Sequence, residues 1–131
     1  MIKKEWKNPN LKLSFLNALR GLIFIIKLER YSKIIVFSGI LVIILGIFLK
    51  ISVLELVALI TVIALVFISE TLNAILENTF NLIKPNYDLK IKTLKEMSAG
   101  FVLFSSMIAS IVGSLIFIPK LIKILKSIYF F

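Results

Sequence analysis

The sequence contains no cysteine and no histidine among its 131 residues. Their absence excludes disulfides, thiolate nucleophiles, imidazole bases and the usual zinc ligands. Acidic residues are also scarce, with 7 Asp and Glu against 16 Lys and Arg, and the formal net charge is +9. Any acid, base or metal chemistry must therefore depend on a small number of carboxylates.

Apolar side chains are abundant, at 60% of the residues, where soluble domains usually have about 45–50%. A transmembrane helix needs about 20 mostly apolar residues, so the chain has room for three spans and little else. In so apolar a chain, the basic excess favours the surface of an anionic bilayer as the partner and argues against nucleic acid.

Basic residues are dense in the first 33 positions, and apolar residues recur between them at three- and four-residue spacing from Leu13 to Ile26. This pattern predicts an amphipathic helix over residues 11–28 that lies in the membrane interface. The alternative is a secretory signal peptide, but charges interrupt the apolar run and no small-residue cleavage site follows it.

Three apolar runs near residues 33–50, 52–84 and 97–120 are each long enough to span a bilayer. Pro85 is expected to end the second span, and residues 85–95 are interpreted as a polar loop. Pro119 and the lysines that follow it are expected to mark the exit of the third. We therefore predict one all-α membrane domain over residues 1–131, with a surface helix and three transmembrane helices.

The basic start of the chain predicts a cytoplasmic N-terminus by the positive-inside tendency, with the loop at 84–96 on the same side. Three spans then place Lys120, Lys123 and Lys126 on the opposite face, against that tendency. We accept this conflict because the early segments usually dominate orientation.

Polar residues gather at the far end of the second span. Glu70 lies roughly 28 Å along the helix from a boundary at Ile51, close to the thickness of the hydrocarbon core. Asn73 and Glu77 follow at i+3 and i+7, so all three side chains share one face. The alternative interpretation is that they are solvated residues on a helix that has left the membrane.

Glu70 and Glu77 are about 10 Å apart along the axis, too far for both to ligate one Mg²⁺ ion. Their roles must then differ. Glu77 needs a second carboxylate from another helix to hold a metal, and Glu29 lies on the correct side of the membrane. Lys95 can reach phosphates as a mobile point charge, although Lys95 and Glu96 taken alone fit an ordinary charged helix start.

Residues 68–77, Ile-Ser-Glu-Thr-Leu-Asn-Ala-Ile-Leu-Glu, resemble the signature of the prokaryotic diacylglycerol kinase family, which includes undecaprenol kinases. The match extends over nearly the whole chain. It includes the surface-helix pattern at Ser14, Phe15, Ala18 and Gly21, the glutamate at position 29, the stretch 95–100 and the closing residues 116–120.

The resemblance implies a homotrimeric, multi-pass lipid kinase of the bacterial inner (plasma) membrane, with active sites between subunits. Such an enzyme transfers the γ-phosphate of ATP, with Mg²⁺ as cofactor, to the hydroxyl of a membrane lipid alcohol. Undecaprenol is the expected acceptor, because residues 116–120 are similar to Gram-positive members, and diacylglycerol is the next.

The resemblance also implies residue roles. Glu70 corresponds to the proton acceptor and, with Asn73, forms the expected catalytic pair, while Glu29 and Glu77 correspond to the residues that hold the divalent metal with ATP. The expected nucleotide contacts, including phosphate contact by Lys95, carry over by position to Asn17, Glu29, Glu77, Asn86, Tyr87, Asp88, Lys95 and Glu96.

Four positions depart from the family pattern: Tyr31 and Ile35 stand where many members have asparagine and histidine, and Asn81 and Glu96 replace aspartates. These departures motivate a second hypothesis, a catalytically degraded member that binds lipid or assembles with partners. Composition alone also allows a cationic membrane-permeabilising protein, but such a protein needs no ordered glutamate spacing.

The topology can be tested with the single-cysteine variants Asn8→Cys and Lys90→Cys, because the chain has no other thiol. Both positions are expected to react with a membrane-impermeant thiol reagent from the cytoplasmic face. Labelling from opposite faces would rule out the predicted topology.

Overall fold

The computed structural model describes residues 10–129, and their backbone is almost entirely helical. The helices are α1 (Leu11–Leu28), α2 (Arg30–Phe48), α3 (Val53–Ile83) and α4 (Leu89–Tyr129). The last three are long and apolar enough to cross a membrane. The predicted all-α membrane fold is confirmed, and the predicted labelling site at position 8 lies outside the described residues.

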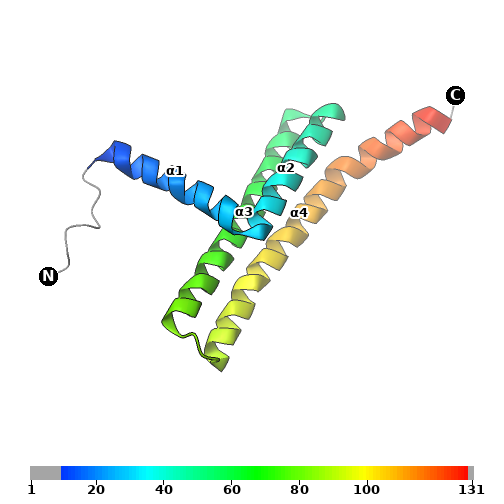
Figure 1. Cartoon of the computed structure of the whole chain (residues 1–131). Helices are drawn as coiled ribbons and strands as arrows, with labels where there is room; N and C mark the ends of the chain where they lie inside the picture. Colours follow the sequence, from blue (N-terminus) through cyan, green and yellow to red (C-terminus); the bar gives the residue numbers. More distant parts are fainter. Residues whose placement is uncertain (1–9, 130–131) are drawn as a thin grey trace.

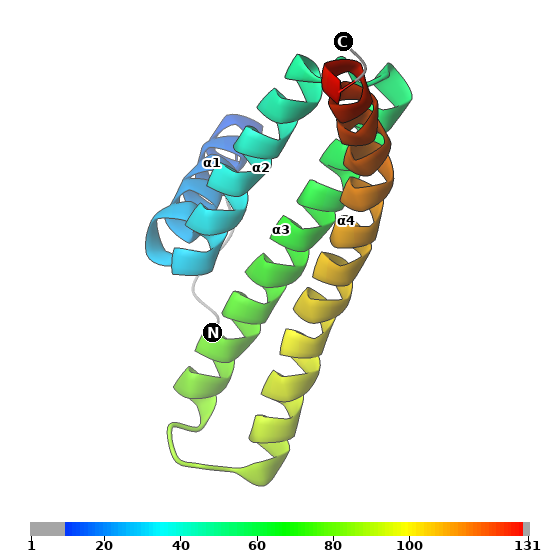
Figure 2. The ribbon, with the colours of Figure 1, turned by 90° about the vertical axis from the view of Figure 1, so that its right-hand side faces the viewer.

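Helix α3 is the centre of the bundle and packs against both α2 and α4. Helix α1 projects sideways from its junction with α2, and the α3–α4 hairpin extends well beyond that junction (Figures 1 and 2). The 19 residues of α2 span about 28 Å, close to the hydrocarbon thickness of a bilayer. Helix α1 and the α2–α3 connection therefore lie at opposite membrane faces, and the hairpin leaves the membrane on the α1 side.

The start of α3 is fixed by side-chain caps. Ser52 and Glu55 form a reciprocal capping box at the start of α3, in which the Ser52 hydroxyl accepts from the Glu55 N–H and the Glu55 carboxylate accepts from the Ser52 N–H. This arrangement satisfies two N–H groups that the helix itself leaves unpaired. It sets the sharp reversal between α2 and α3 at the face opposite α1.

One of the predicted helix boundaries is wrong. Residues 89–95 form the first two turns of α4 and not a loop, because the Asp88 carboxylate accepts from the backbone N–H groups of Lys90 at 2.8 Å and Ile91 at 3.3 Å. Helix α4 also continues through Pro119 to Tyr129. Proline removes one backbone hydrogen bond and bends a helix, but the leucines and lysines that follow are good helix formers.

Two glycines of α2 allow its backbone to pack closely against α3 and the α2–α3 connection. A Cβ atom at Gly39 would lie 2.8 Å from Ile63 Cγ2, and one at Gly46 would lie 2.7 Å from Ile51 Cδ1. Both glycines are buried. Backbones can approach closely in a membrane only where side chains are this small, and dispersion contacts then hold the helices together.

We predict that Gly39→Ala weakens the α2–α3 pair by about 1–3 kcal/mol, because the β-branched Ile63 cannot yield easily in a helix. Gly21→Ala is the matched control, since nothing lies within 4 Å of a Cβ built there. The control is expected to be neutral or slightly stabilising. Unfolding of the purified variants in mixed detergent micelles measures both, and equal stabilities would contradict the close-packing argument.

Candidate functional site

A cavity of about 450 Å³ opens between the start of α2 and the middle of α3 and α4. It contains four of the expected site residues. Glu29 comes from the α1–α2 junction, and Glu70, Asn73 and Glu77 come from one face of α3. The lining residues are Glu29, Tyr31, Glu70, Asn73, Ala74, Glu77, Ala99, Val102, Leu103 and Ser106.

The three carboxylates of this cavity differ in their surroundings. Glu70 is buried, with 7% of its surface exposed, while Glu77 is exposed and Glu29 is half-buried. Glu29 Oε1 accepts a hydrogen bond from Asn78 Nδ2 at 3.3 Å, a partner that sequence analysis missed. Between residues 10 and 129, no side chain pairs with the carboxylate of Glu70 or of Glu77. Their oxygens are therefore available to coordinate a cation or to accept a hydrogen bond from a hydroxyl.

The carboxylates suit a metal that brings other ligands with it. No group of three or more acidic side chains in the described part of the chain is arranged to hold a metal ion alone. Mg²⁺ in proteins is usually bound by one or two carboxylates together with water and substrate phosphates. Glu29 and Glu77, on different elements of one cavity, match that ligand set.

Asn73 is held in position by α4. Ser98 Oγ donates a hydrogen bond to Asn73 Oδ1 at 2.6 Å and lies 2.9 Å from the Lys95 carbonyl oxygen. With its oxygen engaged, Asn73 keeps its N–H donors for the cavity. Sequence analysis missed this function of Ser98, and the available signal was a serine at the start of the apolar run, one turn after Lys95.

A second cavity, of about 290 Å³, lies at the tip of the α3–α4 hairpin. It is rich in lysine, and Lys95 Nζ donates to Asn81 Oδ1 at 2.7 Å across the two helices. Asn17 lies on exposed α1 and lines neither cavity. The lining residues of the hairpin cavity are Asn81, Lys84, Pro85, Asn86, Tyr87, Asp88, Ile91, Lys92, Lys95 and Glu96.

Asp88 is engaged in the structure of the hairpin. One of its carboxylate oxygens caps α4, and the other pairs with the Lys84 ammonium. The Lys84 ammonium and the two backbone donors lower the pKa of the Asp88 carboxyl below its ordinary value. A carboxyl with a lowered pKa stabilises the folded hairpin above its unfolded pKa and loses that effect as the pH falls through the folded value.

Comparison with known proteins identifies the family of the chain. The sequence model of the prokaryotic diacylglycerol kinase family matches residues 16–117. This range includes Glu29, the residues of both cavities and all of α2 and α3. The chain belongs to the prokaryotic diacylglycerol kinase family. Family membership points to a membrane-bound lipid kinase.

Two relatives of this family member differ in the lipid for which they are named. The chain is 32% identical over 108 residues to the undecaprenol kinase of Bacillus subtilis (strain 168), covering 82% of this chain and 88% of the relative. It is 31% identical over 125 residues to the diacylglycerol kinase of Synechocystis sp., covering 94% of this chain and 71% of the relative. No solved structure gives a significant match to this family member.

Proposed function

We propose that the chain transfers the γ-phosphoryl group of Mg-ATP to the terminal hydroxyl of a membrane lipid alcohol. The observation that supports this proposal is the cavity in which Glu29, Glu70, Asn73 and Glu77 meet. Glu29 comes from the α1–α2 junction, far in the sequence from the three residues on α3, and an ordinary solvated face of α3 would not require a carboxylate from another element in the same cavity.

The position of the cavity fits a reaction between a lipid and a soluble nucleotide. Glu29 lies at the α1–α2 junction, at the membrane face marked by α1 (Figure 1). The cavity has an apolar wall from α4, including Val102 and Leu103, and the lysine-rich cavity lies farther out along the same hairpin. A lipid hydroxyl can thus enter from the bilayer while the phosphates enter from water.

Glu70 is the group we assign to the acceptor hydroxyl. An alcohol keeps its proton until attack, so a carboxylate within hydrogen-bond reach must orient it and accept the proton as the new phosphorus–oxygen bond forms. The bond from the γ-phosphorus to the bridging oxygen breaks, and ADP leaves. Asn73, whose oxygen is engaged by Ser98, has N–H donors left to position the same reacting groups.

We assign Glu29 and Glu77 to the metal bound with the nucleotide. Mg²⁺ bound there would supply neutralisation of the phosphate charge, which is a large part of catalysis in phosphoryl transfer. Lys95, Glu96, Asn86 and Tyr87 form the proposed nucleotide contacts in the hairpin cavity. Asp88 belongs to the same cavity, but its carboxylate is occupied by the cap and by Lys84, so its contribution is to hold the hairpin.

A homotrimer is part of the proposal. Asn17 is separated from both cavities of its own chain, so it can meet the nucleotide only if a neighbouring subunit brings its α1 helix to the site. This is the arrangement that the family resemblance implies, and it gives the exposed polar residue a function.

Undecaprenol is the acceptor that we favour, because residues 116–120 are similar to those of Gram-positive members of the family. Diacylglycerol is the second choice. The second candidate function is a member that binds lipid without transferring phosphate. It is favoured by Tyr31, which lines the carboxylate cavity, and by Asn81, which accepts from Lys95 where the family has an aspartate.

Transfer of labelled phosphate from ATP, with the two lipids offered separately in detergent micelles, tests the proposal. Label in lipid is expected, with undecaprenol preferred over diacylglycerol. Bound lipid without label would support the second candidate function, and a preference for diacylglycerol would reject our choice of acceptor.

We predict that Glu70→Gln lowers turnover on the order of 10²-fold or more, because the amide keeps size and polarity but cannot accept a proton. Binding of Mg-ATP is expected to stay near normal, since Glu70 lies about two turns from Glu77. Phosphate transfer and nucleotide binding are both measured on the purified variant. Retained turnover, or a loss of nucleotide binding as severe as in Glu77→Gln, would contradict the assigned roles.

Glu77→Gln and Glu29→Gln are expected to raise the Mg²⁺ concentration required for half-maximal activity, because a hard cation loses a charged oxygen ligand. Glu55→Gln is the control, since it removes one carboxylate at the opposite membrane face. A titration of activity with Mg²⁺ compares the three variants. An unchanged Mg²⁺ dependence in both cavity variants would exclude this pair as the metal ligands.

A further inference from the structure

The last ten residues of α4, residues 120–129, form a helical segment that the proposed kinase chemistry does not use. We call it the 120–129 segment. It follows Pro119, which lies inside the helix and is expected to bend it. Figure 1 shows the C-terminal part of α4 diverging from α2 and α3. The bend lies at the membrane face opposite α1, because Lys120 Nζ is 3.2 Å from Glu55 Oε2 in the first turns of α3.

The 120–129 segment is amphipathic. At about 100° per residue, Lys120, Lys123, Lys126 and Ser127 occupy one arc of the helix, and the large apolar residues occupy the rest. Those apolar side chains are between 43% and 66% exposed, so the bundle does not cover them. They are Leu121, Ile122, Ile124, Leu125 and Ile128.

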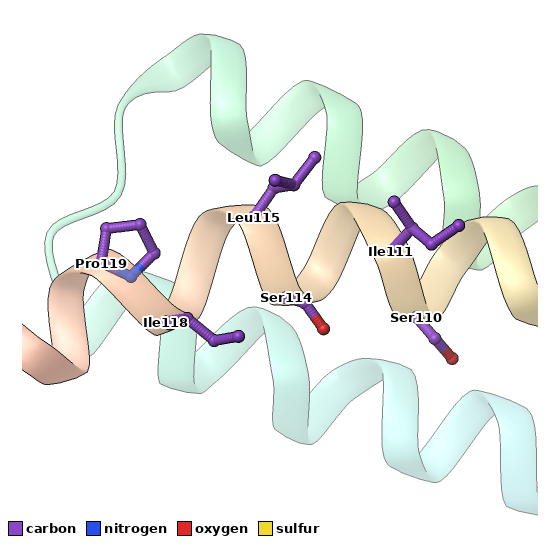
Figure 3. A pocket seen from close by; sticks show the side chains of 6 residues that line it. All are labelled: Ser110, Ile111, Ser114, Leu115, Ile118 and Pro119. Carbon is purple, nitrogen blue, oxygen red and sulfur yellow. The ribbon is translucent and has the colours of Figure 1, made fainter.

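The apolar face of this segment continues an exposed apolar surface of α4. Ile111, Ile118 and Leu125 follow one another at seven-residue spacing, which keeps them on one side of a helix. The first two line a shallow cavity of about 410 Å³ on that side, together with Pro119 (Figure 3). If α4 bends toward this exposed side where it leaves the membrane, the apolar face turns down onto the bilayer surface.

The ion pair between Lys120 and Glu55 fixes the direction in which the lysine-bearing face of the segment points. It holds the lysine arc toward the α2–α3 connection, so the bend leaves Lys123 and Lys126 at the level of the headgroups. Neither lysine forms an ion pair within residues 10–129, and the sequence contains no acidic residue after Glu96. Their charge is therefore available to an anionic partner.

We propose that the 120–129 segment is a second surface helix, which docks on the leaflet opposite α1 and binds the phosphate groups of anionic lipids through Lys123 and Lys126. Apolar residues on one face and lysines on the other are what a bilayer interface requires. Each lysine near an anionic surface is expected to favour docking about fivefold. The proposal does not depend on the kinase activity.

The absence of cysteine from the chain makes single nitroxide labels straightforward. Leu125→Cys places the label on the apolar face, and Ser127→Cys places it on the lysine face without removing a charge. The full chain is reconstituted in vesicles of phosphatidylcholine alone or mixed equally with phosphatidylglycerol. Collision with oxygen, which concentrates in lipid, is compared with collision with a water-soluble nickel chelate.

In the mixed vesicles, the label at position 125 is expected to collide with oxygen and to be shielded from nickel, with the reverse at position 127. Access of nickel to both labels would show a segment free in water and would overturn the proposal. Shielding of both labels, with spin–spin broadening that disappears on dilution with unlabelled chain, would show pairing with a second copy and would also overturn it.

The charge requirement is tested by adding Lys123→Gln and Lys126→Gln to the Leu125→Cys chain. The ratio of docked to free segment in mixed vesicles is expected to fall about 25-fold, with little change in phosphatidylcholine. The matched control is Lys12→Gln with Lys27→Gln on α1, which removes the same charge at the other face and should leave the ratio unchanged. Equal docking of the double variant and the parent in mixed vesicles would exclude phosphate binding by these lysines.

Discussion

The length of α3 relative to the bilayer is the constraint on which the other features depend. Its 31 residues extend about 46 Å, whereas the hydrocarbon core is about 30 Å thick. Because Ser52 fixes the start of the helix at one face, the excess length must leave the membrane at the other. Glu77 is carried beyond the hydrocarbon by this excess, and Glu70 and Asn73 are left near the boundary.

Helix α4 completes the site because it packs along the same length of α3. The two helices are joined by polar contacts where they leave the hydrocarbon: Ser69 and Ser105 hydroxyls lie 2.7 Å apart, and Ser98 bonds Asn73. Such contacts fix the rotation of one helix about its axis relative to the other, which apolar van der Waals packing alone does not specify. The rotation in turn decides which face of α3 the cavity exposes.

The two membrane faces of the molecule are built differently. On one face, α1 projects sideways from its junction with α2, and the α3–α4 hairpin extends beyond that junction (Figures 1 and 2). That part of the molecule carries Glu77 and the lysines of the hairpin cavity. On the other face, a short connection, a capping box and the pair of Glu55 with Lys120 close the bundle. Both cavities that contain the proposed site residues lie toward the first face, so the proposed chemistry does not use the lysines of the second.

The sequence by itself determined the number and approximate extent of the membrane helices, because apolar length and helical periodicity are local properties of the chain. The same periodicity placed Glu70, Asn73 and Glu77 on one face of α3. Only the tertiary structure decided that Glu29 shares their cavity, that Ser98 orients Asn73, and that α4 begins at Leu89, after the Asp88 cap, and continues past Pro119. Those outcomes depend on how helices rotate and pack against one another and on which side chains then reach a free backbone group, and no local pattern contains that information.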